Sequence, residues 1–242
     1  IKEFAAYLST EAGLRNGSIW ANCMWLKGVV MKAHYNGLIP RNPFIQFHIS
    51  PNVKEREYLT EDELKAVMTH EFADSKLAYI RDIFIFASFT ALSFVDIQEL
   101  TNDNIVEVNG EKWILSKRHK TKVAFQVKLL DIPLQIVERY RPMQKDNRIF
   151  PGLNYWSICK PLKRMIRECG ITKSISFHCS RHGFATLALS KGMPIESVSR
   201  VLGHTNIVTT QLYAKITTQK LDNDLTMFGD KLSKTFNGIT MS

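Results

Sequence analysis

Four features of the sequence combine side chains that could act together on a phosphodiester. His178 and Arg181 are three residues apart, so on a helix they would share a face. His204 follows a Leu-Gly pair typical of a helix end, and Tyr213 comes nine residues later. Lys120 lies within a run of basic residues. Together the four features predict a site for an anionic group.

Each of these residue types has a defined use on a phosphate. An arginine can bind two non-bridging oxygens at once, and histidines add further hydrogen-bond donors. A lysine can protonate a departing alkoxide, and a tyrosine can act as a covalent nucleophile when nearby cations stabilise its anion. The sequence has no cluster of carboxylates typical of a metal site, so we expect neither a metal nor another cofactor.

Taken singly, each feature has a plainer explanation. A His-x-x-Arg pair, a Leu-Gly-His helix end, a tyrosine on an amphipathic helix and a basic turn all occur often in purely structural roles. Their occurrence together, in this order and with these gaps, is much more specific than any one of them.

A small sheet is predicted in the middle of the chain. Residues 105–115 form a hairpin with Asn109-Gly110, the strongest two-residue turn signal, at its tip. Residues 123–129 alternate apolar and polar side chains, as a half-buried strand does. Three short antiparallel strands follow from this pattern, with 116–122 as the second turn.

Helices account for most of the remaining residues. Ser18 is expected to cap a helix that Gly37 ends, and Thr60 with Glu63 has the spacing of a capping box. Gly192 is expected at a helix end, like the glycine before His204. The predicted helices cover most of 1–49 and then 60–68, 77–89, 132–141, 155–168, 178–190, 195–202, 206–213 and 218–227. The fold class is therefore mainly α with a small three-stranded antiparallel sheet.

Composition narrows the class of protein further. The chain has 242 residues, of which 45% are hydrophobic, and a net charge of +9 that favours an anionic partner. We expect neither a membrane span nor a signal peptide, because no apolar run is long enough. The four cysteines form no C-x-x-C pair, so we predict buried, reduced thiols and no zinc site.

These motifs resemble those of a known family, the tyrosine recombinases or phage-type integrases. The matching stretches are 90–97 (TALSFVDI), Lys120, His178-x-x-Arg181, Leu202-Gly203-His204 and Tyr213. The resemblance implies a partial helical core-binding domain at 1–49, a linker at 50–58, an α+β catalytic domain at 59–228 and a tail at 229–242. Since the chain starts at Ile1 on a helical pattern, we interpret it as an N-terminally truncated fragment.

The resemblance also implies a role for each site residue. Tyr213 would be the nucleophile that forms a 3′-phosphotyrosyl bond, and Arg181 the second catalytic arginine. Lys120 would be the hairpin lysine, and His178 and His204 would occupy the two histidine positions. The implied reaction is site-specific integration or excision of a mobile element, without a metal.

One position departs from the family pattern. The usual Thr-Gly-Leu-Arg carries a first catalytic arginine, and Ser93 stands in its place. Integrases of Bacteroides-type mobile elements share this serine, and the chain most resembles that subset. Arg118 is our candidate substitute, because two residues on an extended hairpin arm share a face and Lys120 is two residues away. The alternative is that Arg118 contacts only the DNA backbone or solvent. His182, next to Arg181, is assigned a structural role.

The implied partners are double-stranded DNA, further copies of the chain and accessory DNA-bending proteins. Paired sites imply a tetramer on DNA, with the tail exchanged between protomers, in the cytoplasm at the bacterial nucleoid. Two other functions stay open: a DNA-binding protein that has lost catalysis, and a type IB topoisomerase-like relaxing enzyme. An RNA-binding module is a poor third, since no aromatic platform is evident. The expected phosphate-binding residues are Lys27, Lys32, Lys117, Lys122, Lys160, Lys163 and Arg164.

Overall fold

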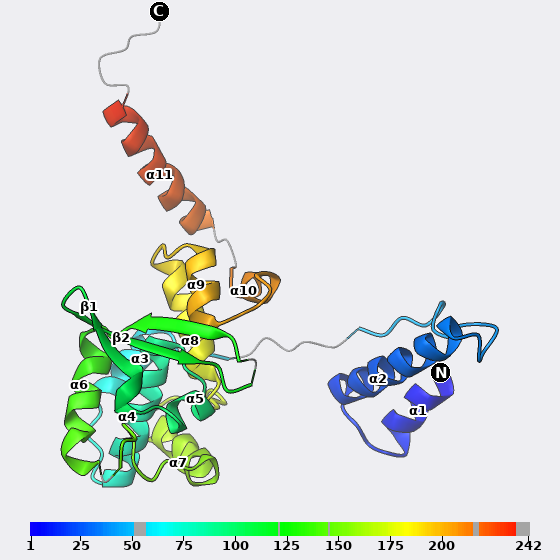
Figure 1. Ribbon diagram of the computed structural model, residues 1–242, viewed down its shortest axis with the longest axis horizontal. Helices are drawn as coiled ribbons and strands as arrows, with labels where there is room; N and C mark the ends of the chain where they lie inside the picture. Colours follow the sequence, from blue (N-terminus) through cyan, green and yellow to red (C-terminus); the bar gives the residue numbers. More distant parts are fainter. Residues whose placement is uncertain (51–56, 121, 145, 215–217, 236–242) are drawn as a thin grey trace, which may run out of the picture. The chain divides into compact units, whose positions relative to one another are not determined.

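The chain divides into two compact units, Ile1–Glu55 and Arg56–Ser242 (Figure 1). The computed structural model describes residues 1–50, 57–120, 122–144, 146–214 and 218–235. Most of the predicted linker, 50–58, lies outside the described residues. Among the described helices, none is both long and apolar enough to span a lipid bilayer.

Unit 1 consists of two helices, α1 (Lys2–Thr10) and α2 (Asn16–Tyr35), packed through a small apolar cluster. The prediction that Ser18 caps the second helix is wrong, because α2 begins earlier and Arg15 occupies the N-cap. Ile19, in the first turn of α2, belongs to the same apolar cluster as Leu8 of α1. Gly37 has a φ of 73° and follows the end of α2, as predicted.

Unit 2 holds eleven helices or helical turns and one sheet in its described residues. Its N-terminal half runs α3 (Glu61–Thr69), α4 (Ser75–Thr90), α5 (Phe94–Gln98), η1 (Asn102–Asn104), β1 (Ile105–Val108), β2 (Glu111–Lys117) and β3 (Ala124–Lys128). Its C-terminal half runs α6 (Asp131–Tyr140), η2 (Arg141–Met143), α7 (Tyr155–Glu168), α8 (Cys179–Ser190), α9 (Ile195–Leu202), α10 (Val208–Gln211) and α11 (Thr218–Thr235). The predicted class, mainly α with a three-stranded antiparallel sheet, is confirmed.

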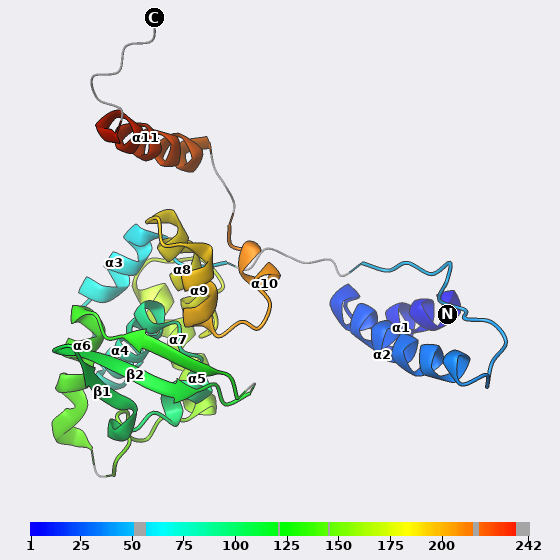
Figure 2. The same cartoon turned by 45° about the horizontal axis from the view of Figure 1, so that its top comes forward.

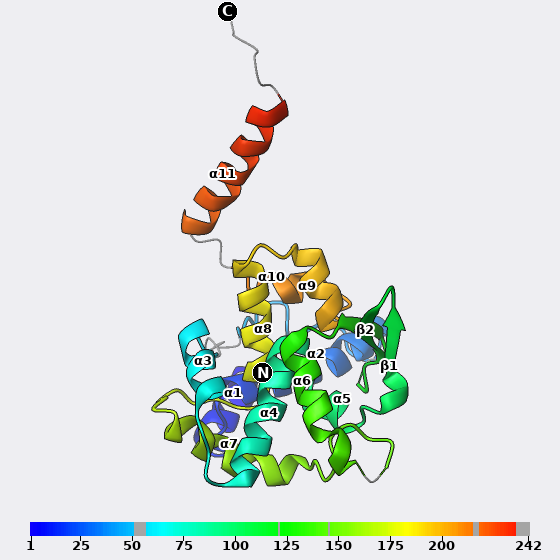
Figure 3. The same cartoon turned by 90° about the vertical axis from the view of Figure 1, so that its left-hand side faces the viewer.

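Helix α4 forms the centre of unit 2. Its sequence is apolar on almost every side, which is typical of a helix covered all round by other elements. Helices α3, α6, α7 and α8 all pack against it (Figure 3). The end of this fully buried helix therefore gives a fixed reference for the residues that follow it.

The sheet has the order β1-β2-β3, and both pairs are antiparallel. Asn109 and Gly110 have φ values of 53° and 77°, the left-handed pair that a tight hairpin requires. Ile114, Phe125 and Val127 point into the core, which confirms the predicted alternation. Figure 2 shows the sheet crossing in front of α4.

Two predictions for the C-terminal part need correction. The helix expected at 206–213 is shorter and covers only α10. The helix expected at 218–227 continues to Thr235, because Leu225, Phe228 and Leu232 keep a helical apolar spacing beyond the expected end. The first part of the predicted tail, 229–242, is therefore helical, and 236–242 lies outside the described residues.

All four cysteines are free thiols, as predicted. Cys23 and Cys179 are buried, whereas Cys159 and Cys169 are half-buried, so the prediction of burial holds for two of them. Burial raises the pKa of the Cys169 thiol, which keeps it protonated and unreactive at neutral pH.

Candidate active site

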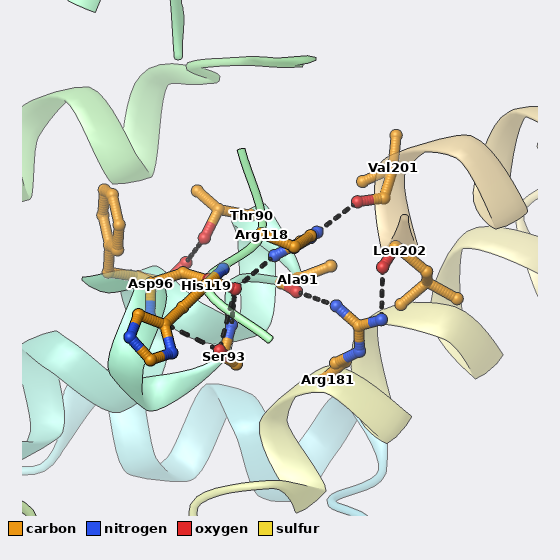
Figure 4. Close-up of polar contacts among 10 residues, drawn as sticks. Thr90, Ala91, Ser93, Asp96, Arg118, His119, Arg181, Val201 and Leu202 are labelled. Carbon is orange, nitrogen blue, oxygen red and sulfur yellow. Dashed lines mark hydrogen bonds and ion pairs between the residues drawn. The ribbon is translucent and has the colours of Figure 1, made fainter. Parts of the chain in front are cut away.

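Helix ends and a hairpin turn meet at the candidate active site. The N-termini of α5 and α8, the C-termini of α4 and α9, and the turn between β2 and β3 all contribute residues (Figure 4). The terminal turns of a helix leave backbone N–H and C=O groups without intrahelical partners. Side chains at this junction can therefore be held by backbone groups as well as by one another.

Arg181 is held by the C-terminal ends of two helices. Its Nη1 donates a hydrogen bond of 2.9 Å to the carbonyl of Ala91, the C-cap residue of α4. Its Nη2 donates to the carbonyl of Leu202, the last residue of α9. The C-terminus of a helix carries partial negative charge, so both ends attract the guanidinium. Arg181 is thus fixed although it is only half-buried.

Arg118 is held even more tightly, with an exposed fraction of 5%. Its Nη1 lies 2.8 Å from Oδ2 of Asp96, and its Nη2 donates a 2.5 Å hydrogen bond to the carbonyl of Val201. The flat face of the guanidinium lies 4.1 Å from the centre of the Phe125 ring. Three neighbours from three different elements therefore fix its position.

Ser93 serves as the N-cap of α5. Its Oγ donates a 2.8 Å hydrogen bond to Oδ2 of Asp96, and the two residues form a capping box. Oδ1 of the same carboxylate accepts a 2.9 Å hydrogen bond from the backbone N–H of His119. Where the family pattern has an arginine, this chain therefore has a helix cap whose carboxylate binds Arg118 from the hairpin.

The carboxylate of Asp96 stays ionised in this setting. Its burial would raise its pKa, but the hydrogen bonds from His119, Arg118 and Ser93 outweigh that effect and lower the pKa below its ordinary value. A buried carboxylate with this many donors can balance the charge of one guanidinium. Among the residues that the structure describes, Arg118 has such a carboxylate partner, whereas the hydrogen bonds of Arg181 go to backbone carbonyls.

The two arginines therefore give the site an excess of partly buried positive charge. Burial lowers the pKa of Arg181 to about 10, and the charge of Arg118 lowers it further in the same direction. Burial also lowers the pKa of Arg118, while its pairing with Asp96 opposes this. Both guanidiniums remain protonated at neutral pH, so a bound anion would relieve their mutual repulsion.

His204 lies in the loop after α9 and is neutral at pH 7. Burial lowers the pKa of its imidazole to about 4, and the nearby charges of Arg181 and Arg118 act in the same direction. Its Nδ1 lies 2.9 Å from Oγ1 of Thr210, a fully buried residue of α10. This contact orients the ring and leaves Nε2 available to a ligand.

Tyr213 lies beside these cations in the same chain. Its ring centre is 5.1 Å from that of His182, which in turn is 4.6 Å from the ring of His178. The negative form of Tyr213 interacts favourably with Arg181, which partly opposes the lowering of the arginine pKa. The structure thus brings the predicted tyrosine, histidines and arginine together without a second protomer.

Arg118 and Lys120 lie close together in the chain, just after β2. Strand β2 ends at Lys117, His119 and Lys120 lie in a turn, and the backbone N–H of Lys122 donates a 2.8 Å hydrogen bond to the Arg118 carbonyl. The prediction that Arg118 and Lys120 share one face of an extended hairpin arm is therefore wrong. The side chain of Arg118 instead turns inward to the site, while Lys120 is exposed in the turn.

Sequence reasoning did not place Asp96 and His182 in the site. The spacing of Ser93 and Asp96, a serine followed three residues later by an acid, was a readable capping signal. His182 comes four residues after His178, so their shared helix face was readable from the sequence, whereas its contact with the ring of Tyr213 joins two segments that are distant in sequence.

The predicted phosphate-binding residues differ in how available they are. Lys27 is half-buried and the others are exposed. Arg164 already pairs with Glu168 at 2.8 Å and with Asp74 at 3.4 Å, so less of its charge is free for DNA. The remaining exposed members are Lys32, Lys117, Lys122, Lys160 and Lys163.

Comparison with known proteins gives consistent relatives. The tyrosine recombinase XerA of Pyrococcus horikoshii is 32% identical over an alignment of 177 residues, which covers 67% of this chain and 58% of the relative. The tyrosine recombinase XerC of Lactobacillus leichmannii is 25% identical over an alignment of 229 residues, which covers 88% of this chain and 77% of the relative.

Solved structures share the fold at low sequence identity. A Tn1549 transposon integrase in complex with a circular intermediate DNA superposes with a TM-score of 0.79 at 18% identity, over 93% of this chain and 83% of that one. The XerH recombinase bound to a palindromic difH substrate gives a TM-score of 0.70 at 20% identity, over 93% and 71% of the two chains. A model of the phage integrase family matches residues 57–220. Because this match covers well over half of the sequence, the chain belongs to the phage integrase family, that of the tyrosine recombinases.

Proposed function

We propose that this chain is a site-specific DNA recombinase that cuts and rejoins strands through a 3′-phosphotyrosyl link to Tyr213. The observation that carries the proposal is the placement of Tyr213 beside His182, His178 and Arg181 in one chain. The relatives XerA and XerC are named tyrosine recombinases, which supports the same activity. A mobile-element setting draws support from the Tn1549 integrase.

The reaction follows from the site residues. The phenol of Tyr213 gives up its proton to solvent, and its oxygen attacks the scissile phosphorus while Arg181 and Arg118 bind the non-bridging oxygens. The bond from phosphorus to the 5′ oxygen breaks, and Lys120 supplies the proton that turns this oxygen into a hydroxyl. His178 and neutral His204 donate further hydrogen bonds to the phosphate. A 5′ hydroxyl from a partner strand then reverses the attack and releases Tyr213.

Arg118 takes the place of the arginine that the family pattern has at Ser93. The support for this assignment is that Asp96, part of the capping box with Ser93, binds the Arg118 guanidinium at 2.8 Å. The side chain of Arg118 therefore comes from the hairpin and lies in the region that a long side chain at position 93 would occupy. This arrangement matches the proposal that the chain is an integrase of the Bacteroides-type mobile elements.

The wider assembly is part of the same proposal. The core-binding domain at 1–49 and the catalytic domain at 59–228 close around duplex DNA, and four protomers act on paired sites. Accessory DNA-bending proteins assist, and the protein works in the cytoplasm at the nucleoid. The net charge of +9 and the DNA complexes of the Tn1549 integrase, XerH and lambda integrase support DNA as the substrate.

A nicked suicide substrate tests the nucleophile. We expect the wild type to form a covalent adduct, which mass spectrometry maps to Tyr213. Tyr213→Phe should abolish the adduct and keep the DNA affinity, because only the nucleophilic oxygen is lost. An adduct on another residue overturns the assignment. Binding without any wild-type adduct identifies a non-catalytic DNA-binding protein, and relaxation of supercoils without junctions identifies a topoisomerase.

The role of Arg118 has its own test. Arg118→Ala should slow adduct formation about 10²- to 10³-fold, the effect of removing one donor to a transition-state oxyanion. Arg139→Ala is the matched control, because Arg139 also pairs with a buried carboxylate, at 2.7 Å, on a different face of the core. Near-normal cleavage by Arg118→Ala, with binding intact, contradicts this part of the proposal.

A further inference from the structure

Gly203 packs more closely against a neighbour than any other glycine in the described part of the chain. A β-carbon built on Gly203 would lie 2.9 Å from Nε and 3.1 Å from Cγ of Arg118. For every other described glycine, the nearest such contact is 4.0 Å or more. Heavy atoms essentially never approach a β-carbon to within 3.0 Å, so any side chain here would displace Arg118.

Arg118 has little room to yield to such a displacement. Its guanidinium is fixed by Asp96, the Val201 carbonyl and the Phe125 ring, as described above. Its Nε is buried without a hydrogen-bond partner and is the atom nearest to the position of that β-carbon. Movement away from Gly203 would therefore break the ion pair with Asp96 or the bond to Val201.

The conformation of Gly203 does not by itself explain the glycine. Gly203 has a φ of 63°, which only glycine adopts at no steric cost. Gly192 also has a positive φ, 87°, two residues after the end of α8, but nothing lies within 4 Å of its β-carbon position. The two positions share the backbone requirement, and only Gly203 also faces a catalytic side chain.

The end of α9 therefore acts on both arginines of the site. The carbonyls of Val201 and Leu202, consecutive in the chain, accept from Arg118 and Arg181 respectively, and Gly203 comes next (Figure 4). We propose that Gly203 is a positioning residue, whose missing side chain lets Arg118 lie against this helix end beside Arg181. The inference rests on the proposed function, in which Arg118 binds the scissile phosphate.

Paired substitutions test the inference. Gly203→Ala and Gly192→Ala impose the same backbone strain, and Gly203→Asn and Gly192→Asn repeat the comparison with a residue that tolerates a left-handed conformation. We expect the two Gly203 variants to form adduct about a hundredfold more slowly, because a displacement near 1 Å of a catalytic group costs that much. The Gly192 variants should cleave nearly as well as the wild type, and all four should bind DNA.

A double-mutant cycle on stability separates this inference from the proposed function. Urea unfolding should show that Gly203→Ala is much less destabilising in an Arg118→Ala background, where the close contact is absent, whereas Gly192→Ala costs the same in both backgrounds. Equal costs of Gly203→Ala in the two backgrounds overturn the inference, even if the single variant folds poorly. The inference is also overturned if the Gly203 variants form adduct at the wild-type rate while Arg118→Ala forms none. An active Arg118→Ala overturns instead the role proposed for Arg118.

Discussion

At the residue scale, His204 makes the fold sensitive to mild acid. Its imidazole has a pKa of about 4 in the folded chain against 6.5 ordinarily, so as the pH falls the unfolded state takes up the proton first. The stability that the neutral ring contributes above pH 6.5 is therefore lost as the pH falls towards 4.

We predict that the wild type loses more stability than His204→Asn between pH 7 and pH 4.5. Urea unfolding at several pH values measures the difference, since asparagine does not titrate. Parallel stability profiles for the two proteins would show that His204 is not buried beside the arginines in its neutral form.

Asp96 is a second residue whose substitution should lower both the stability and the activity of the protein. Asp96→Asn leaves the buried charge of Arg118 without its partner, so we predict a loss of about 3–5 kcal/mol in the free energy of unfolding and a large loss of cleavage. Asp82→Asn is the control, because Asp82 is equally buried and binds Arg81 and Arg139 instead. If both variants cleave alike at matched stability, Asp96 has no special link to the site.

The identity of most site residues could be predicted from sequence, but their surroundings could not. Arg181 and Tyr213 stood out through motif spacing. The burial of Arg118 depends on Asp96, 22 residues away, and on Val201, 83 residues away. Local patterns do not report such distant contacts. The sequence therefore suggested Arg118 for a different reason, an extended arm shared with Lys120, which the turn at His119 and Lys120 contradicts.

At the element scale, the hairpin tip gives a clear test of backbone conformation. Gly110→Ala should destabilise unit 2 by about 1–2 kcal/mol, because the φ of 77° strains any residue with a β-carbon. Gly28→Ala makes the same chemical change inside α2, where nothing outside the helix backbone lies within 4 Å of the new β-carbon. It should stabilise unit 1 by about 0.5–1 kcal/mol. In chemical unfolding, the two substitutions should change the free energy of unfolding in opposite directions. A change in the same direction would contradict the backbone explanation.

Elements with strong local signals were predicted closely. Helices α7 and α9 have the expected bounds, and the Thr60 capping box begins α3 as predicted. The start of α2 and the length of α10 were missed, and neither helix has a side-chain hydrogen bond at its N-cap that would mark its start in the sequence. The apolar spacing beyond residue 227 already indicated that α11 continues, so the predicted end of this helix was placed too early.

At the scale of the whole molecule, the charge of +9 should make DNA binding strongly dependent on salt. If 6–10 phosphates are contacted, the affinity should fall about 10³- to 10⁵-fold between 50 and 200 mM salt. Lys163→Gln should lower the slope of log affinity against log salt by about 1. Arg164→Gln should lower it less, because Glu168 and Asp74 already neutralise that side chain. Equal slopes for the two variants, measured by fluorescence anisotropy, would contradict this difference.

The route by which Arg118 reaches Asp96 bears on how relatives of this chain are recognised. A survey that scores one alignment column for arginine would discard this protein as inactive, on account of Ser93. A survey that asks instead which guanidinium reaches the acid three residues later would retain it. If Arg118 binds the scissile phosphate as proposed, members of such a group would supply this positive charge from different positions in the sequence.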